Sequence, residues 1–199
     1  MSENKSSRVL VNIIGVPSLL GIIILGDTFY NLPLFSIFIA IVLFLGAIEI
    51  KSITKSKDGQ PMIEVLVLFL FILQLNRHHH INLKLSNNEL IMILTVLIMI
   101  IEIFRAQIWS VKTSLLNIST VIFSFVWLGI MLGSLVELRN LPGIGYKITL
   151  VTFLSVWICD TSAFLFGKKF GNKKILPLVS PNKTWFGTLS GLVGSILFL

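Results

Sequence analysis

The chain has 199 residues, of which 55% are hydrophobic and only 13% charged, with a mean hydropathy of +0.94 and a formal charge of +7. This balance excludes an ordinary soluble domain, which needs far more polar surface to cover its core, whereas lipid covers apolar surface directly. The positive charge therefore favours basic cytoplasmic loops of a membrane protein over nucleic-acid binding.

Seven hydrophobic stretches follow one another along the chain, separated by short polar segments. A helix of about 20 apolar residues crosses the hydrocarbon core of a bilayer. We therefore predict an all-α fold, a polytopic transmembrane helical bundle of about seven spans. The predicted spans cover residues 9–26, 32–50, 62–75, 89–104, 114–136, 147–167 and 184–199. The third and fourth are short for a span.

Two domains are predicted along this series of spans. Residues 1–146 supply the N-terminal and middle transmembrane helices, and residues 147–199 begin a catalytic transmembrane region. The last stretch, from Thr184 to Leu199, stays apolar to the final residue. Membrane proteins rarely stop in mid-span, so we expect the chain to be truncated.

The basic residues predict the topology. With the N-terminus inside, the inner segments hold Lys5, Arg8, Lys51, Lys55, Lys57, Arg105, Lys112, Lys168, Lys169, Lys173, Lys174 and Lys183. The outer segments hold Arg77, Lys84, Arg139 and Lys147. This positive-inside bias predicts a multi-pass protein of the cell inner (plasma) membrane with its active face on the cytoplasmic side. Such basic loops also suit anionic headgroups and phosphorylated substrates.

Asp160 is an acid inside the sixth predicted span, about two turns before its cytoplasmic end. A carboxylate costs roughly 2.5–3.5 kcal/mol at the centre of a membrane helix and less near the interface, so such residues usually face a partner or a water-filled cavity. Phe164 and Gly167 follow at i+4 and i+7 on the same helix face. A polar packing contact is the structural alternative, and we favour a functional role.

The segment from Lys168 to Lys183 carries five lysines and no acid. It ends in Ser180-Pro-Asn-Lys-Thr184, and Pro beside Ser, Asn and Thr is typical of a helix N-terminus. Such a terminus offers free N–H groups and a positive dipole end to an anion. No Gly-x-x-x-x-Gly precedes Lys183, so the segment is not a Walker A loop. Gly187 and Gly191 then form a small-xxx-small pattern that allows close helix packing.

An acid, a basic loop and an anion-binding helix start thus lie within about 25 residues. A divalent cation bridges carboxylate and phosphate oxygens in the simplest such site. The residues alone therefore predict phosphate chemistry at the cytoplasmic interface.

Two runs in this region resemble the phosphatidate cytidylyltransferases (CDP-diacylglycerol synthases). The first runs Asp-Thr-Ser-Ala-Phe-Leu-Phe-Gly-Lys-Lys-Phe-Gly from Asp160, and the second runs Ser-Pro-Asn-Lys-Thr-Trp-Phe-Gly from Ser180. The family carries Asp-Ser/Thr-x-Ala-Tyr/Phe-x-x-Gly-Lys/Arg-x-Phe/Leu-Gly and then Ser-Pro-x-Lys-Thr-x-x-Gly. This chain has Ser190-Gly191 where the family has Gly-Gly, and the family's later Gly-His-Gly-Gly…Asp-Arg-x-Asp signature is not among its residues.

The resemblance implies a reaction in which CTP and phosphatidate give CDP-diacylglycerol and pyrophosphate, with Mg²⁺ as cofactor. It implies that Asp160 and Lys183 are catalytic and that Asp160 also binds metal. The implied substrate-binding residues are Ser180, Asn182, Thr184, Lys168 and Lys169. The expected partners are CTP, phosphatidate and membrane lipids, with no nucleic acid. A homodimer is the oligomeric state we consider.

Three alternatives are weighed against this interpretation. A CTP-using polyprenol or dolichol kinase would share the membrane-embedded nucleotide site, but the Ser-Pro-x-Lys-Thr segment favours the cytidylyltransferase. A non-catalytic transporter or binding protein, with an ion coupled to Asp160, would predict repeated halves or a second broken helix. The third alternative is a truncated chain without activity.

Overall fold

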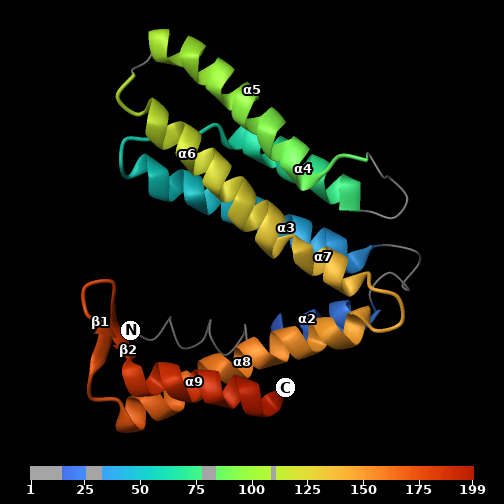
Figure 1. The fold of residues 1–199 in the computed structure, drawn as a ribbon, viewed down its shortest axis with the longest axis vertical. Helices are drawn as coiled ribbons and strands as arrows, with labels where there is room; N and C mark the ends of the chain where they lie inside the picture. The colour runs from blue at the N-terminus through green and yellow to red at the C-terminus, as the bar shows by residue number, and fades with distance from the viewer. Residues whose placement is uncertain (1–14, 26–32, 78–83, 109–110) are drawn as a thin grey trace. The chain divides into compact units, whose positions relative to one another are not determined.

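The computed structural model describes residues 15–25, 33–77, 84–108 and 111–199, and within these ranges the chain is mostly helical (Figure 1). It forms two compact units, one ending at Leu141 and one running from Pro142 to Leu199. The first unit contains α2 (Val16–Leu25), α3 (Leu34–Lys55), α4 (Ile63–Arg77), α5 (Asn87–Ile108), α6 (Ser114–Ser124), a π-helical stretch η2 (Phe125–Leu132) and α7 (Ser134–Arg139). The second contains α8 (Gly145–Phe170), β1 (Lys174–Leu176), β2 (Ser180–Thr184) and α9 (Trp185–Phe198).

The helices confirm the predicted all-α membrane fold. Four helical stretches of the described residues are long and apolar enough to cross a membrane: Leu34–Lys55, Asn87–Ile108, Ser114–Arg139 and Gly145–Phe170. The fourth predicted span, short in the sequence, extends into its polar flanks as the 22-residue α5. The third remains short, as the 15-residue α4. The first predicted span starts outside the described residues, which show only α2 from it.

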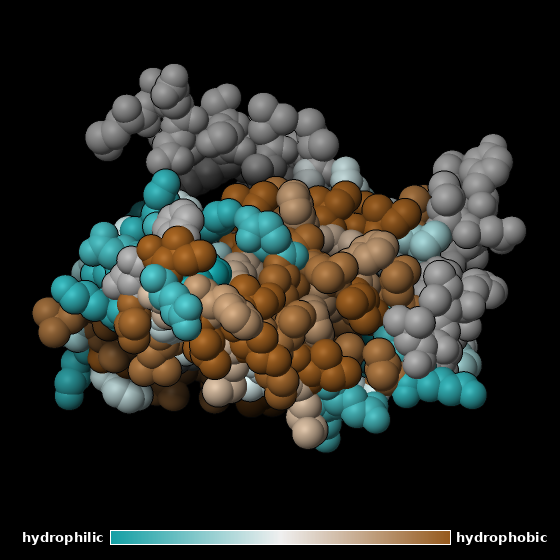
Figure 2. Space-filling view, turned by 90° about the horizontal axis from the view of Figure 1, so that it is seen from above, coloured by the Kyte–Doolittle hydropathy of each residue, from teal (hydrophilic) through white to brown (hydrophobic). Residues whose placement is uncertain are grey.

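The core of the first unit follows from residues that repeat about once per helical turn. In α3, every fourth residue from Phe35 to Ala47 is buried, and in α5 the same spacing runs from Leu90 to Glu102. The other faces of these helices expose large apolar side chains such as Phe44 and Met92. Figure 2 shows a broad hydrophobic surface with hydrophilic side chains toward its borders. Such a surface needs lipid or another protein segment to cover it.

Arg77 stabilises the π-helical stretch of the first unit. Its guanidinium donates to the Gly129 and Ile130 carbonyls, with N–O distances of 2.7 and 3.3 Å, and forms an ion pair with Glu137 at 2.6 Å. The Arg77 side chain is only 3% exposed. The sequence placed Arg77 in an outer segment, and the structure adds that it anchors η2 and α7 to the end of α4.

The second unit is a helical hairpin in which α8 and α9 pack along each other and the two short strands form the connection (Figure 1). A Cβ atom added at Gly187 would lie 2.8 Å from the Ala163 carbonyl oxygen, and one at Gly191 would lie 2.8 Å from that of Cys159. No real Cβ fits at such a distance from backbone. The close helix packing predicted from Gly187 and Gly191 is therefore confirmed.

Candidate functional site

Asp160 lies in α8, beside its contact with α9. Cys159 and Ala163 face the α9 backbone at Gly191, whereas Asp160, one residue further around the helix, is exposed on this unit. Within the part of the chain that the structure describes, Asp160 has no hydrogen-bond or ion-pair partner. Its carboxylate is thus available to a ligand, an ion or a neighbouring segment, rather than used in the hairpin.

The connection between α8 and α9 is a two-stranded antiparallel ribbon, in which Lys174 pairs with Thr184 and Leu176 pairs with Ser180. The Val179 N–H closes its turn by donating to the Leu176 carbonyl at 3.2 Å. The sequence predicted that Ser180 to Thr184 lie at the start of a helix, and α9 begins at the next residue, Trp185. It did not predict the ribbon itself. Residues 180–183 are extended because their backbone pairs across the ribbon, and Pro181 lies in β2 rather than in the first helical turn.

Thr184 is the residue that caps α9. Its backbone is extended, and its Oγ1 accepts a hydrogen bond from the Gly187 N–H at 3.2 Å. This confirms that a hydroxyl of the predicted segment caps the helix. The side chain is buried against Gly167 and Gly171, and it fits there because glycine has no side chain. The packing therefore fixes Thr184, and with it the direction in which the chain enters α9.

The predicted basic residues gather at this end of the hairpin. Lys168 and Lys169 occupy the last turn of α8, where cations are favoured by the helix dipole, and both are exposed. Their ammonium groups lie 5.9 and 5.2 Å from the ring centroids of Phe164 and Phe170. Lys183 is exposed on β2, directly before the cap. The arrangement offers several cations to an anion at the ribbon end of the unit.

The structure brings the predicted residues together only in part. Thr184 lies at the α8 end, against Gly167 and Gly171, so Lys168, Lys169 and Lys183 share one region. Asp160 lies eight residues before Lys168, about 12 Å along the helix axis at 1.5 Å per residue. It is level with Gly191 of α9, since Cys159 contacts that glycine. The hairpin alone thus presents a cationic end and a separate carboxylate along one helix.

Ser180 and Asn182 have different exposures on β2. Ser180, opposite Leu176, is half-buried, whereas Asn182 is exposed. Both lie on β2, which ends at the capping residue Thr184, so both share one end of the hairpin with Lys183. Their polar side chains could add neutral hydrogen bonds to a phosphate that the lysines attract.

A metal at Asp160 would need ligands beyond this hairpin. Among the described residues, no three His, Cys, Asp or Glu side chains are close enough to hold an ion together. Mg²⁺ commonly takes only one or two carboxylates and completes its shell with water and substrate phosphates. The exposed Asp160 carboxylate fits the role of one such ligand.

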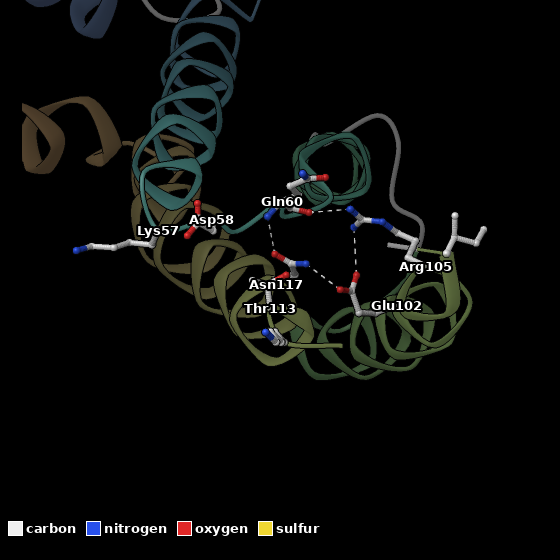
Figure 3. Close-up of a pocket in the computed structure, with 9 residues that line it drawn as sticks. Lys57, Asp58, Gln60, Glu102, Arg105, Thr113 and Asn117 are labelled. Atoms are coloured by element: carbon white, nitrogen blue, oxygen red, sulfur yellow. Dashed lines mark hydrogen bonds and ion pairs between the residues drawn. The ribbon is translucent and has the colours of Figure 1, made fainter. Parts of the chain in front are cut away.

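A polar network in the first unit was mostly missed from the sequence. Glu102, 3% exposed, accepts from Arg105 of the same helix at 3.1 Å and from Asn117 Nδ2 at 2.8 Å. Asn117 Oδ1 accepts the Gln60 N–H at 2.7 Å, and Arg105 donates to the Gln60 carbonyl at 3.0 Å. Figure 3 shows these four residues joined in a ring. An Asn inside the fifth apolar stretch was the signal for it.

The fold and the exposed apolar helices define a helical membrane protein. The chain belongs to the cytidylyltransferase family, whose model matches residues 6–199. It is 36% identical over 86 residues to the phosphatidate cytidylyltransferase of Staphylococcus saprophyticus, a match that covers 43% of this chain and 32% of the relative.

Two further relatives carry the same name. The phosphatidate cytidylyltransferase of Staphylococcus aureus strain COL is 37% identical over 86 residues, again 43% of this chain and 32% of the relative. That of Staphylococcus epidermidis strain ATCC 35984 is 45% identical over 53 residues, which are 27% of this chain and 20% of the relative. The matches thus span about a third or less of these relatives. No solved structure matches the chain.

Proposed function

We propose that this chain provides the Asp160 helix and the cationic hairpin of a membrane enzyme that converts CTP and phosphatidate to CDP-diacylglycerol and pyrophosphate. The observation that carries the proposal is the family match over residues 6–199, joined to relatives named phosphatidate cytidylyltransferase. Those names favour nucleotidyl transfer over the kinase and transporter alternatives. The exposed lysines at the hairpin end supply the charge that a nucleotide and an anionic lipid both require.

In the proposed reaction a phosphatidate oxygen attacks the α-phosphorus of CTP. A new phosphorus–oxygen bond forms, the bond between the α-phosphorus and the bridging oxygen to the β-phosphate breaks, and pyrophosphate leaves with that electron pair. The attacking phosphate is already anionic, so no general base is needed. Catalysis then depends on positioning and on neutralising the charge of the phosphates.

Each predicted residue has a role in this proposal. Lys183 would neutralise a phosphate at the start of α9, and Lys168 and Lys169 would attract the nucleotide or the lipid headgroup. Ser180, Asn182 and Thr184 would donate hydrogen bonds to phosphate oxygens. The Asp160 carboxylate would hold Mg²⁺, which, when bound, neutralises phosphate charge.

Asp160→Asn in the intact protein tests the proposal, because the change preserves shape and removes charge. We expect incorporation of radiolabelled CTP into CDP-diacylglycerol to fall by at least about 100-fold, in line with the loss of one group that stabilises a developing charge. Thr152→Val, about two turns earlier on α8 and outside the run that resembles the family, is the control and should keep most activity. Near-normal incorporation by Asp160→Asn would make Asp160 a structural residue.

The proposed location is the cell inner membrane, with the ribbon of the second unit on the cytoplasmic side. The positive-inside bias supports this orientation. Single cysteines at positions 55, 147 and 173, in a Cys159→Ser background, provide a test with a membrane-impermeant thiol reagent on intact cells. We expect labelling at position 147 only, and labelling at 55 or 173 would reverse the topology.

A further inference from the structure

A hollow of about 430 Å³ lies at the end of the first unit where α3 ends and α4 begins. Its lining includes the cations Lys51, Lys55 and Arg105 and one acid, Glu64. Glu64 is already paired with Lys51 at 2.9 Å. Lys51 and Lys55 lie one helical turn apart, so they share a face of α3. The hollow therefore carries a net positive charge, which suits an anionic ligand.

Arg105 is held rigidly at this hollow. Glu102 and the Gln60 carbonyl each accept one of its hydrogen bonds, and Asn117 completes the ring (Figure 3). A guanidinium has five N–H donors, so these two bonds leave others for a ligand. Arg binds phosphate through paired hydrogen bonds, and a pre-positioned side chain loses little entropy in doing so. Figure 3 also shows Lys57 extending away from the ring, so Lys57 is not counted as a ligand.

An apolar groove of about 140 Å³ follows the same two helices toward the middle of the bundle. It is lined by residues of α3 and α4, among them Phe44 and Phe71, which are 48% and 58% exposed. Phe44 lies seven residues before Lys51, and Phe71 lies seven residues after Glu64. Seven residues are two helical turns, about 10 Å, and return to the same helix face. The groove and the hollow thus lie along one α3–α4 seam.

We propose that the α3–α4 seam binds a single anionic membrane lipid. The phosphate headgroup would occupy the hollow at Lys51, Lys55 and Arg105, and an acyl chain would lie along the groove at Phe44 and Phe71. A soluble phosphate would leave the groove empty, and a zwitterionic lipid would bring a cation of its own to a positive hollow. Only an anionic lipid matches both features. The proposal concerns the first unit and does not depend on the proposed reaction.

Native mass spectrometry of the intact protein, released from micelles that contain phosphatidylglycerol or phosphatidylcholine, measures the retained lipid. We expect retention of phosphatidylglycerol at least about fivefold above phosphatidylcholine. Lys55→Gln should weaken phosphatidylglycerol binding about fivefold, the change for one Lys that contributes about 1 kcal/mol at an anionic surface. Lys55→Glu should weaken it further. Lys147→Gln, an exposed lysine of α8, is the matched control and should change nothing.

The groove is tested with the same measurement. Phe71→Ala should lower retention of a long-chain phosphatidylglycerol severalfold but leave that of a short-chain analogue nearly unchanged, because only the long chain reaches the groove. Arg105 stays unaltered in these variants since it also holds the buried Glu102. Equal retention of the two headgroups, an unaffected Lys55→Glu variant, or displacement of phosphatidylglycerol by millimolar inorganic phosphate would each overturn the proposal.

Discussion

The two units of this chain are stabilised in different ways. In the unit that ends at Leu141, buried Leu, Ile and Phe side chains pack between helices, and Arg77 and Arg105 each connect residues far apart in the sequence. In the second unit, the buried residues of the two helices are Gly145, Thr149, Gly187 and Gly191. The first unit therefore depends on side chains, and the second on close approach of backbone.

This difference bears on function. Because α8 and α9 pack through small residues, most of their larger side chains face outward, including Asp160 and Lys168. A helical hairpin of this kind can present chemical groups to ligands without giving up its own packing. The first unit instead uses two of its charged side chains internally, Glu102 and Arg77, to join separate helices.

Of the substitutions proposed for either unit, Arg105→Met should lower the free energy of unfolding the most. The change leaves the Glu102 carboxylate buried without its charge partner, which costs about 3–5 kcal/mol. The measurement is the free energy of unfolding in mixed micelles, followed by circular dichroism. The double variant Glu102→Met/Arg105→Met should lose less than the single variant, since no charge is left buried. Equal losses would show that the ion pair is not what stabilises this end.

Gly187→Ala should be the most damaging small change in the second unit. The new Cβ would lie 2.8 Å from the Ala163 carbonyl oxygen, and backbone cannot move aside as a flexible side chain can. Overpacking of this kind costs about 2–3 kcal/mol. Gly21→Ala is the matched control, because its Cβ would meet nothing within 4 Å and a helical Ala gains about 0.5–1 kcal/mol over Gly. The two variants should therefore shift the unfolding midpoint in opposite directions.

The sequence predicted the helical fold well because lipid-facing helices must be apolar along their whole length. It placed the helices at nearly the observed ranges. It also located the cap near Thr184, although not the ribbon before it. The strand pairing of Lys174 with Thr184 depends on a turn whose residues have no strong strand pattern.

The polar network was harder to predict, because its partners come from separate helices. Gln60 takes part through its backbone groups, which carry no sequence signal, and Asn117 is a single polar residue in an apolar stretch. The Arg77 contacts were hidden for the same reason, since two of its three partners are carbonyls of the π-helical stretch. Sequence patterns report faces of single helices, whereas these contacts depend on how helices pack.

Lys183→Ala tests whether the outward-facing hairpin residues act on phosphate. We expect kcat/KM for CTP or phosphatidate to fall roughly tenfold or more, because a charge-assisted hydrogen bond contributes about 1.5–3 kcal/mol. Lys183→Arg should restore only part, since its planar fork replaces a compact charge. Lys173→Ala is the control: a solvated lysine contributes at most about 1 kcal/mol, and its effect should shrink in high salt. Equal effects of the two alanine variants would remove Lys183 from the site.

Thr184→Ala should have the smallest effect on stability, and it separates structure from chemistry at the start of α9. Loss of the bond between Thr184 Oγ1 and the Gly187 N–H should cost about 1 kcal/mol in the free energy of unfolding. Thr184→Ser keeps the hydroxyl and should recover most of it.

Steady-state kinetics are then measured well below the unfolding midpoint, where all three proteins are folded. If Thr184 also binds phosphate, the alanine variant loses kcat/KM there while the serine variant does not, because a hydroxyl can accept from Gly187 and donate to a ligand together. Unchanged kinetics in both variants would restrict Thr184 to its capping role and leave Lys183 as the nearest predicted ligand of the phosphate.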